Sequence, residues 1–221
     1  SVISGDNDPG RFRRGSTSEH DFVGRSQEMA RMLQLMSPGL TLIHGPGGIG
    51  KSRLAREQCP DTEHHFFVSL EQIQTGSELI QAVAAAIGVP LASPEMQGQL
   101  EQLGEAITAR RLRRLALDNL EQLEPKAYEA IEGLHQRSPE TCFLMTSRLD
   151  VPLSGVRVLA LGPLKPEPGL QLYLQRARAV DPTFQANAVD QQGIRDFVGA
   201  VGGMPLAIEL AASRCRVLPP S

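Results

Sequence analysis

Short apolar runs alternate along the chain with longer segments whose apolar residues recur every three or four positions. Five runs have the length and composition of strands, and they lie at 40–44, 65–70, 114–118, 142–147 and 156–161. The last three are apolar at almost every position, which is typical of strands that are buried on both faces. Segments of helical period separate the runs. This alternation predicts a parallel sheet of about five strands with helices on both faces.

Two of the expected helices have features that a structure can check. Residues 21–36 form an amphipathic segment before the first strand, and its apolar face consists of Met29, Met32, Leu33 and Met36. The segment 77–88 follows the second strand, with Ser77 as the candidate N-cap residue and Gly88 at its end.

The pattern changes after Gly162 and Pro163. Three helical segments follow with no strand between them, at 169–180, 189–202 and 204–218. About fifty residues are marginal for an independent core, so we expect these helices to pack on the domain that contains the sheet.

The opening residues differ from both of these parts. Residues 1–20 are polar and rich in Gly and Ser, as expected of a linker or a loosely held tail. The sequence therefore predicts a tail at 1–20, a sheet domain at 21–162 and a small helical subdomain at 163–221.

Composition narrows the possible partners and environment. The formal net charge of −3 does not favour sequence-independent nucleic-acid binding, which needs a basic surface. Cys59, Cys142 and Cys215 are widely spaced and match neither a disulfide set nor a metal pattern, so we expect reduced thiols in a cytoplasmic protein. No apolar run approaches the roughly 18 residues of a membrane span. The chain begins without Met and ends at "LPPS", as expected of a piece of a longer protein.

The first strand leads directly into a glycine-rich segment that fits G-x-x-x-x-G-K-[ST] at every fixed position. Such a loop points successive backbone N–H groups inward, and the helix after it adds a positive N-terminal dipole. The context of a strand before and a helix after favours a phosphate loop over a simple tight turn. Lys51 is expected to reach the β- and γ-phosphates of a nucleotide, and the Ser52 hydroxyl to bind Mg²⁺. The loop consists of Gly45, Pro46, Gly47, Gly48, Ile49, Gly50, Lys51 and Ser52.

Other strands end in residues that suit the same site. Asp118 ends a buried strand, where a carboxylate is costly without a cation, so we expect a Mg²⁺ partner; a turn or cap aspartate is the alternative. Asn119 follows, where many fast P-loop ATPases have a catalytic Glu. Glu121 either orients the attacking water or is a solvated helix acid. Arg148 follows another buried strand and is either a γ-phosphate sensor or part of a surface salt bridge.

Five motifs together resemble a known family. "FVGR" at 22–25, the phosphate loop, "LALDNLEQL", "TSR" and "GGMPLAIELAA" occur in the order seen in STAND ATPases, the signal-transduction ATPases with numerous domains. The chain is most similar to the predicted-ATPase modules of large bacterial transcription regulators, and NB-ARC proteins are more distant kin. The match runs from about residue 21 to 215. The phosphate loop alone indicates only a P-loop NTPase, whereas "FVGR" and the later "GMPL" are much more specific.

The resemblance implies roles by position. Phe22, Val23 and Arg25 match the segment that lines the adenine pocket, with the backbone of Val23 at the edge of the base. Pro205 matches the proline that packs against the nucleotide from the helical subdomain, and Arg148 matches the sensor arginine. The expected nucleotide-binding set also includes Arg53, next to Ser52, and the expected catalytic set is Lys51, Asp118, Glu121 and Arg148.

The chain also departs from the family pattern. Family members continue into a winged-helix subdomain that this sequence does not reach, which puts locking of the ADP state in doubt. Asn119 weakens any claim of fast hydrolysis. With no Trp and only Tyr128 and Tyr173, strong aromatic stacking of adenine is not expected.

These features predict an ATP- and ADP-binding switch with slow Mg²⁺-dependent hydrolysis, working inside a multidomain signalling or transcription regulator. Its expected partners are other domains of the parent chain, and nucleotide-dependent self-association stays open. We expect no membrane contact and no direct nucleic-acid binding. Two alternatives stay open: an AAA+ ATPase that acts on DNA or remodels proteins, and a small-molecule kinase.

Overall fold

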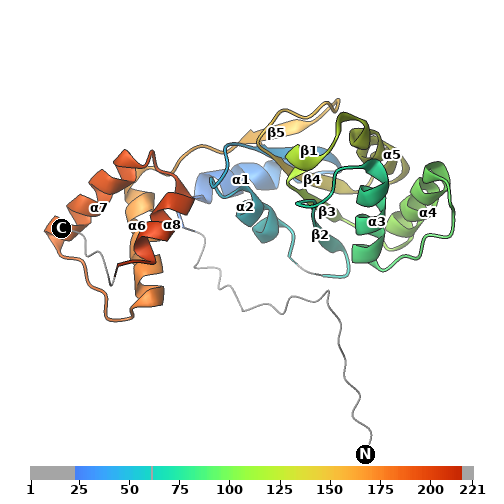
Figure 1. The fold of residues 1–221 in the computed structure, drawn as a ribbon. Helices are drawn as coiled ribbons and strands as arrows, with labels where there is room; N and C mark the ends of the chain where they lie inside the picture. The colour runs from blue at the N-terminus through green and yellow to red at the C-terminus, as the bar shows by residue number, and fades with distance from the viewer. Residues whose placement is uncertain (1–22, 61, 216–221) are drawn as a thin grey trace, which may run out of the picture.

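The computed structural model describes residues 23–60 and 62–215 (Figure 1). Its strands are β1 (Gly39–His44), β2 (His65–Ser69), β3 (Arg114–Asp118), β4 (Cys142–Ser147) and β5 (Arg157–Ala160). They form a five-stranded sheet in the order β2-β3-β4-β1-β5, and all neighbouring strands are parallel. The predicted parallel sheet of about five strands is confirmed.

The carboxyl ends of three strands meet at one edge of this sheet. His44 at the end of β1 is opposite Ser147 at the end of β4. β3 also pairs with β4, and its last residue is Asp118. Because the strands are parallel, the segments that follow them leave the sheet on the same side. The phosphate loop, Asp118 and Arg148 are brought together there, although they are far apart in sequence.

Helices cover both faces of the sheet, as predicted. They are α1 (Ser26–Leu35), α2 (Lys51–Gln58), α3 (Gly76–Ile87), α4 (Met96–Ala109) and α5 (Tyr128–Arg137). Leu42 and Phe143 belong to a buried cluster with side chains of α3, α4 and α5. Their neighbours Ile43 and Leu144 belong to a second cluster with side chains of α1 and α2. Successive strand residues point to opposite faces, which is why apolar runs mark these strands.

The sequence prediction was wrong for two apolar side chains. Val158 of β5 is 55% exposed, because β5 is an edge strand and is not buried on both faces. Leu33 of α1 is 64% exposed, although Met32 is fully buried and Met29 and Met36 are partly buried. The apolar stripe of α1 is therefore wider than the surface that the sheet covers.

The start of α3 also differs from the prediction. Its N-cap residue is Thr75, not Ser77, and Thr75 forms a capping box with Glu78. The Glu78 carboxylate accepts hydrogen bonds from the backbone N–H of Gln74 and Thr75, while the Thr75 hydroxyl accepts one from the N–H of Glu78. Both residues satisfy N–H groups that the first helical turn leaves without partners. Gly88 ends α3 in the left-handed conformation, as predicted.

Three helices form a separate body to one side of the sheet (Figure 1). They are α6 (Pro166–Val180), α7 (Ala188–Ala200) and α8 (Pro205–Ala212). This helical body has its own buried cluster, to which Leu170, Tyr173, Ile194 and Ile208 belong. A helical part after the sheet is therefore confirmed. The exact division at residues 162 and 163 stays a prediction, and residues 1–20 lie outside the described residues.

Two observations concern the environment of the chain. None of the helices in the described part is long and apolar enough to cross a membrane. Cys59, Cys142 and Cys215 are buried thiols. Burial raises the pKa of the Cys142 thiol, so its reactive thiolate is disfavoured.

Candidate nucleotide-binding site

The phosphate loop connects β1 to α2 and depends on glycine at specific points. Gly48 has a φ of 74° and Gly50 a φ of 99°, conformations that residues with a side chain rarely adopt. A Cβ atom at Gly48 would also lie 2.9 Å from the Cβ of Leu206. Gly50 is the N-cap of α2, and Lys51 begins the helix. The strand–loop–helix context that the motif requires is present.

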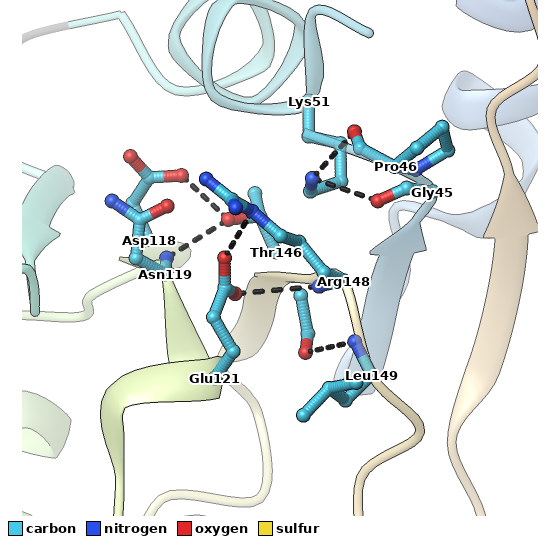
Figure 2. Close-up of polar contacts among 10 residues, drawn as sticks. Gly45, Pro46, Lys51, Asp118, Asn119, Glu121, Thr146, Arg148 and Leu149 are labelled. Atoms are coloured by element: carbon cyan, nitrogen blue, oxygen red, sulfur yellow. Dashed lines mark hydrogen bonds and ion pairs between the residues drawn. The ribbon is translucent and has the colours of Figure 1, made fainter. Parts of the chain in front are cut away.

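Lys51 is buried within the loop. Its ammonium group donates to the carbonyl oxygens of Gly45 at 2.8 Å and Pro46 at 3.1 Å (Figure 2). Burial lowers the pKa of Lys51, and Arg148 lowers it further, whereas the carboxylates of Glu121 and Asp118 raise it. Both of these hydrogen-bond partners are neutral carbonyls, which the buried ammonium group is well placed to exchange for an anion.

Asp118 is buried at the end of β3. Its Oδ1 accepts a 2.5 Å hydrogen bond from the Thr146 hydroxyl, whose oxygen accepts one from the backbone N–H of Asn119 at 3.0 Å (Figure 2). Asn119 takes a left-handed conformation with a φ of 68°, which turns the chain sharply away from the strand. A hydroxyl group is neutral and does not balance the charge of a buried carboxylate, so this position suits a bound cation.

A cation here would need ligands from the nucleotide. The described residues contain no group of three or more His, Cys, Asp or Glu that could hold a metal ion. Mg²⁺ is commonly held by one or two carboxylates together with substrate phosphates and water. Asp118 and the hydroxyl of Ser52 fit that chemistry, because they supply hard oxygen donors and leave the other positions to phosphate.

Glu121 and Arg148 form a pair beside the loop. Glu121 lies on a short 3₁₀ helix, η2 (Leu120–Gln122), and its side chain is only 8% exposed, so it is not a solvated acid. Its Oε1 is 2.9 Å from Nε of Arg148, and its Oε2 accepts a hydrogen bond from the Arg148 backbone N–H at 3.3 Å (Figure 2). The Arg148 guanidinium also lies against Gly47, because a Cβ built there would be 3.0 Å from Cζ. One arginine therefore engages both Glu121 oxygens and touches the phosphate loop.

A cavity of about 290 Å³ lies between the loop and the helical body. Most of the predicted nucleotide-binding residues line it, namely Val23, Arg25, Gly47, Gly48, Ile49, Gly50, Lys51, Ser52, Arg53, Arg148 and Pro205. Four predicted residues are not among the lining residues but contact or adjoin them, namely Gly45, Pro46, Asp118 and Glu121. Phe22 lies outside the described residues. The prediction did not include Asn119, Leu164, Leu172, Leu206 and Glu209, which also line the cavity.

Arg25 lines the cavity in an unexpected way. Its guanidinium is buried, with Nη2 donating to the carbonyl of Ile49 at 3.1 Å and Nη1 to Glu28 at 2.7 Å. The charged group of Arg25 thus holds the backbone of the phosphate loop and links it to α1.

Helix α8 contacts the loop directly. The backbone N–H of Leu206 donates to the Gly48 carbonyl at 3.2 Å. One turn later, Glu209 is 3.7 Å from Arg53 of α2 and 2.9 Å from Arg176 of α6. Pro205 and Glu209 are four residues apart, which places them on one face of the helix. This spacing within "PLAIE" was the one sequence signal for Glu209, but it does not identify what the face contacts.

Sequence similarity to known proteins assigns the chain to a family. A family described as "AAA ATPase domain" matches residues 21–182. An uncharacterized protein of Mycobacterium tuberculosis is 31% identical over 214 residues, which cover 93% of this chain and 54% of the relative. A second Mycobacterium tuberculosis protein, named as an HTH-type transcriptional regulator, is 30% identical over 82% of this chain and 21% of its own length. The chain thus spans about half the length of the first curated relatives that it matches.

Solved structures share the fold. A STAND protein of Pyrococcus horikoshii with a tetratricopeptide repeat sensor has a TM-score of 0.58 and 19% identity, over 86% of this chain and 30% of that one. Drosophila ORC bound to DNA has a TM-score of 0.63 and 14% identity, over 87% of this chain and 60% of that one. At these identities the likeness concerns the fold alone. The chain belongs to the AAA ATPase domain family, and it shares its fold with a STAND ATPase, as its motifs predicted.

Proposed function

We propose that this chain is the nucleotide switch of a longer regulator, which binds ATP and ADP with Mg²⁺ and hydrolyses ATP slowly. One observation carries the proposal: the cavity is lined on one side by the phosphate loop and on the other by α8 of the helical body. A ligand that contacts two bodies binds most tightly when they are closed around it. Its binding therefore shifts the equilibrium between open and closed arrangements.

The phosphate end of the cavity supports polyphosphate binding. Phosphate oxygens would replace the carbonyls of Gly45 and Pro46 as partners of the Lys51 ammonium group. The N-terminus of α2 and the glycine N–H groups before it add a favourable field for anions. When Mg²⁺ is bound, it supplies positive charge to the β- and γ-phosphates. Ser52 and Asp118 are the residues that would hold it.

Slow hydrolysis follows from the residues that flank Asp118. The amide of Asn119 cannot act as a base. Glu121 can, but Arg148 engages both of its carboxylate oxygens, and an oxygen must be free to orient water. A γ-phosphate beside Gly47 would compete with Glu121 for the guanidinium. We therefore propose that Arg148 holds Glu121 inactive until a triphosphate draws it away.

The place of the domain in a larger protein rests on its relatives. The chain covers 21% of a protein named as a transcriptional regulator and 30% of a STAND protein. These proportions support other domains as its partners, and we extend the proposal to nucleotide-dependent self-association in the cytoplasm. The working division is a nucleotide-binding part at 21–162 and a helical part at 163–221.

The structure of Drosophila ORC bound to DNA favours a second candidate, an AAA+ ATPase that acts on DNA. The likeness is one of fold at 14% identity, and the net charge of −3 does not suit a DNA-binding surface. Stimulation of turnover by DNA would support this candidate over the switch.

The proposal is tested by calorimetric titration of ATP and ADP with and without Mg²⁺, on the wild type and on Asp118→Asn. We expect both nucleotides to bind, and Mg²⁺ to strengthen ATP binding in the wild type. The benefit of Mg²⁺ should be lost in Asp118→Asn, because the amide cannot balance the charge of the cation. Exposed Asp150→Asn is the matched control. Absence of binding by either nucleotide would refute the proposal.

A further inference from the structure

Of the described residues that line the cavity, Glu209 is the one with a carboxylate. A negative charge is unexpected in a site for polyphosphate, since like charges repel. Glu209 lies on α8, one turn after Pro205, and its side chain is partly exposed. A carboxylate in this cavity would suit a ligand group that donates hydrogen bonds.

Two arginines hold this carboxylate from one side. Nε and Nη2 of Arg176 donate to Oε1 of Glu209 at 3.1 and 2.9 Å. Nη1 of Arg53 is 3.7 Å from the same oxygen. These contacts fix the orientation of the side chain and offset its charge. Oε2 takes no part in them, so among the described contacts it can accept from another donor. An ionised carboxylate is purely an acceptor, so a ligand hydroxyl or N–H suits it and a phosphate oxygen does not.

The position of Glu209 identifies the part of a nucleotide that it would meet. Arg53 follows Ser52 in the first turn of α2, so the carboxylate lies close to the end of the helix that would hold phosphates. The other walls near α8 are apolar and include Val23, Leu164 and Pro205. A Cβ at Gly24 would lie 3.2 Å from Leu164, which shows that the segment at 23–25 packs against this wall.

In a nucleotide the ribose connects the phosphates to the base, and its two hydroxyl groups are donors. Acidic side chains bind ribose hydroxyls in other nucleotide-binding folds, notably dinucleotide-binding α/β proteins. We propose that Glu209 accepts a hydrogen bond from one of the two ribose hydroxyls and so selects nucleotides that carry that hydroxyl over those that lack it. The inference rests on the proposed nucleotide site and adds a specificity-determining residue to it.

The test compares ATP, 2′-deoxyATP and 3′-deoxyATP by calorimetric titration of the wild type. A hydrogen bond to a charged group contributes about 1.5–3 kcal/mol, so at least one deoxynucleotide should bind about tenfold or more weakly than ATP. Glu209→Ala should weaken ATP binding and bring this ratio close to one, because the hydroxyl then has no acceptor. Glu209→Gln keeps an oxygen without the charge and should give an intermediate ratio.

Glu167→Ala is the matched control. Glu167 also forms a 2.9 Å ion pair with an arginine of the helical body, Arg195, but it does not line the cavity. Its loss should leave the preference for ATP unchanged.

Two outcomes would overturn the inference while leaving the nucleotide site intact. One is equal affinity of the wild type for all three nucleotides. The other is an equal loss for ATP and both deoxynucleotides in Glu209→Ala, which would mean that Glu209 only joins the two bodies. Failure of all three to bind the wild type would instead refute the proposed function, and the inference with it.

Discussion

The two ends of the cavity differ in how their polar groups are held. At the phosphate end Lys51, Asp118 and Thr146 are all buried at the edge of the sheet. Where the helical body meets the loop, the ion pairs of Glu209 join side chains that are 28 to 35% exposed. Exposed ion pairs contribute only about 0–1 kcal/mol each. The comparison indicates that polar groups are held rigidly at the proposed phosphate site, beside a weaker contact between the sheet domain and the helical body.

This difference also separates the residues that would act on the phosphates from those that would respond to the rest of the nucleotide. The groups that would act on a triphosphate come from the ends of β1, β3 and β4, whose positions the sheet fixes. The groups that would sense its base and ribose include residues of α8, which contacts the loop through Leu206 and α2 through Glu209. Changes at the phosphate end should therefore affect catalysis and phosphate affinity strongly. Changes on α8 should have smaller effects, confined to binding and closure.

The largest expected effect concerns hydrolysis. We expect the wild type to turn over ATP well below the enzyme median of about 10 s⁻¹, and Glu121→Gln to lower that rate by about 10²-fold. The amide keeps the shape of the side chain but cannot accept a proton. Phosphate release under multiple turnover measures both rates, with exposed Glu124→Gln as the control. A rate that survives in Glu121→Gln would reduce Glu121 to the ion-pair partner of Arg148.

The next effect concerns phosphate affinity. Lys51→Ala removes a charge-assisted contact of about 1.5–3 kcal/mol, so ATP and ADP should bind about tenfold or more weakly. The midpoint of thermal unfolding should change little, because the loss of the two hydrogen bonds of Lys51 is offset by the removal of a buried charge. Exposed Lys126→Ala should retain wild-type affinity in the same titration. If Lys51→Ala binds both nucleotides normally, the phosphate end is not the fixed site that the comparison describes.

The loop conformation and the gathering of the residues at the phosphate end could be predicted from the sequence because their determinants are local. The spacing of glycines, Lys51 and Ser52 specifies the loop, and strand ends specify Asp118 and Arg148. The pairing of Glu121 with Arg148 could not be predicted in the same way, since it depends on β3 and β4 being neighbours. Strand order is a property of the folded sheet and not of any single segment.

The contact between α8 and the rest of the molecule was less predictable, for a related reason. Pro205 was expected at the cavity from the family pattern, but Glu209 was not, because its partners come from two other helices, α2 and α6. One prediction about the fold was wrong for the same reason. The 3.6-residue period placed Leu33 on the apolar face of α1, yet only packing decides how much of that face is covered.

The smallest expected effect tests whether α8 contacts the nucleotide at all. Pro205 begins α8 and lines the cavity. Pro205→Ala removes apolar surface worth roughly 1 kcal/mol, so adenine nucleotides should bind about fivefold more weakly with the fold retained. Pro166→Ala is the matched control, since Pro166 begins α6 in the same way without lining the cavity, and its affinity should be unchanged. Equal affinities for the two variants would mean that the nucleotide does not reach α8, and a bound structure with the base more than about 6 Å from Pro205 and from residues 23–25 would show the same directly.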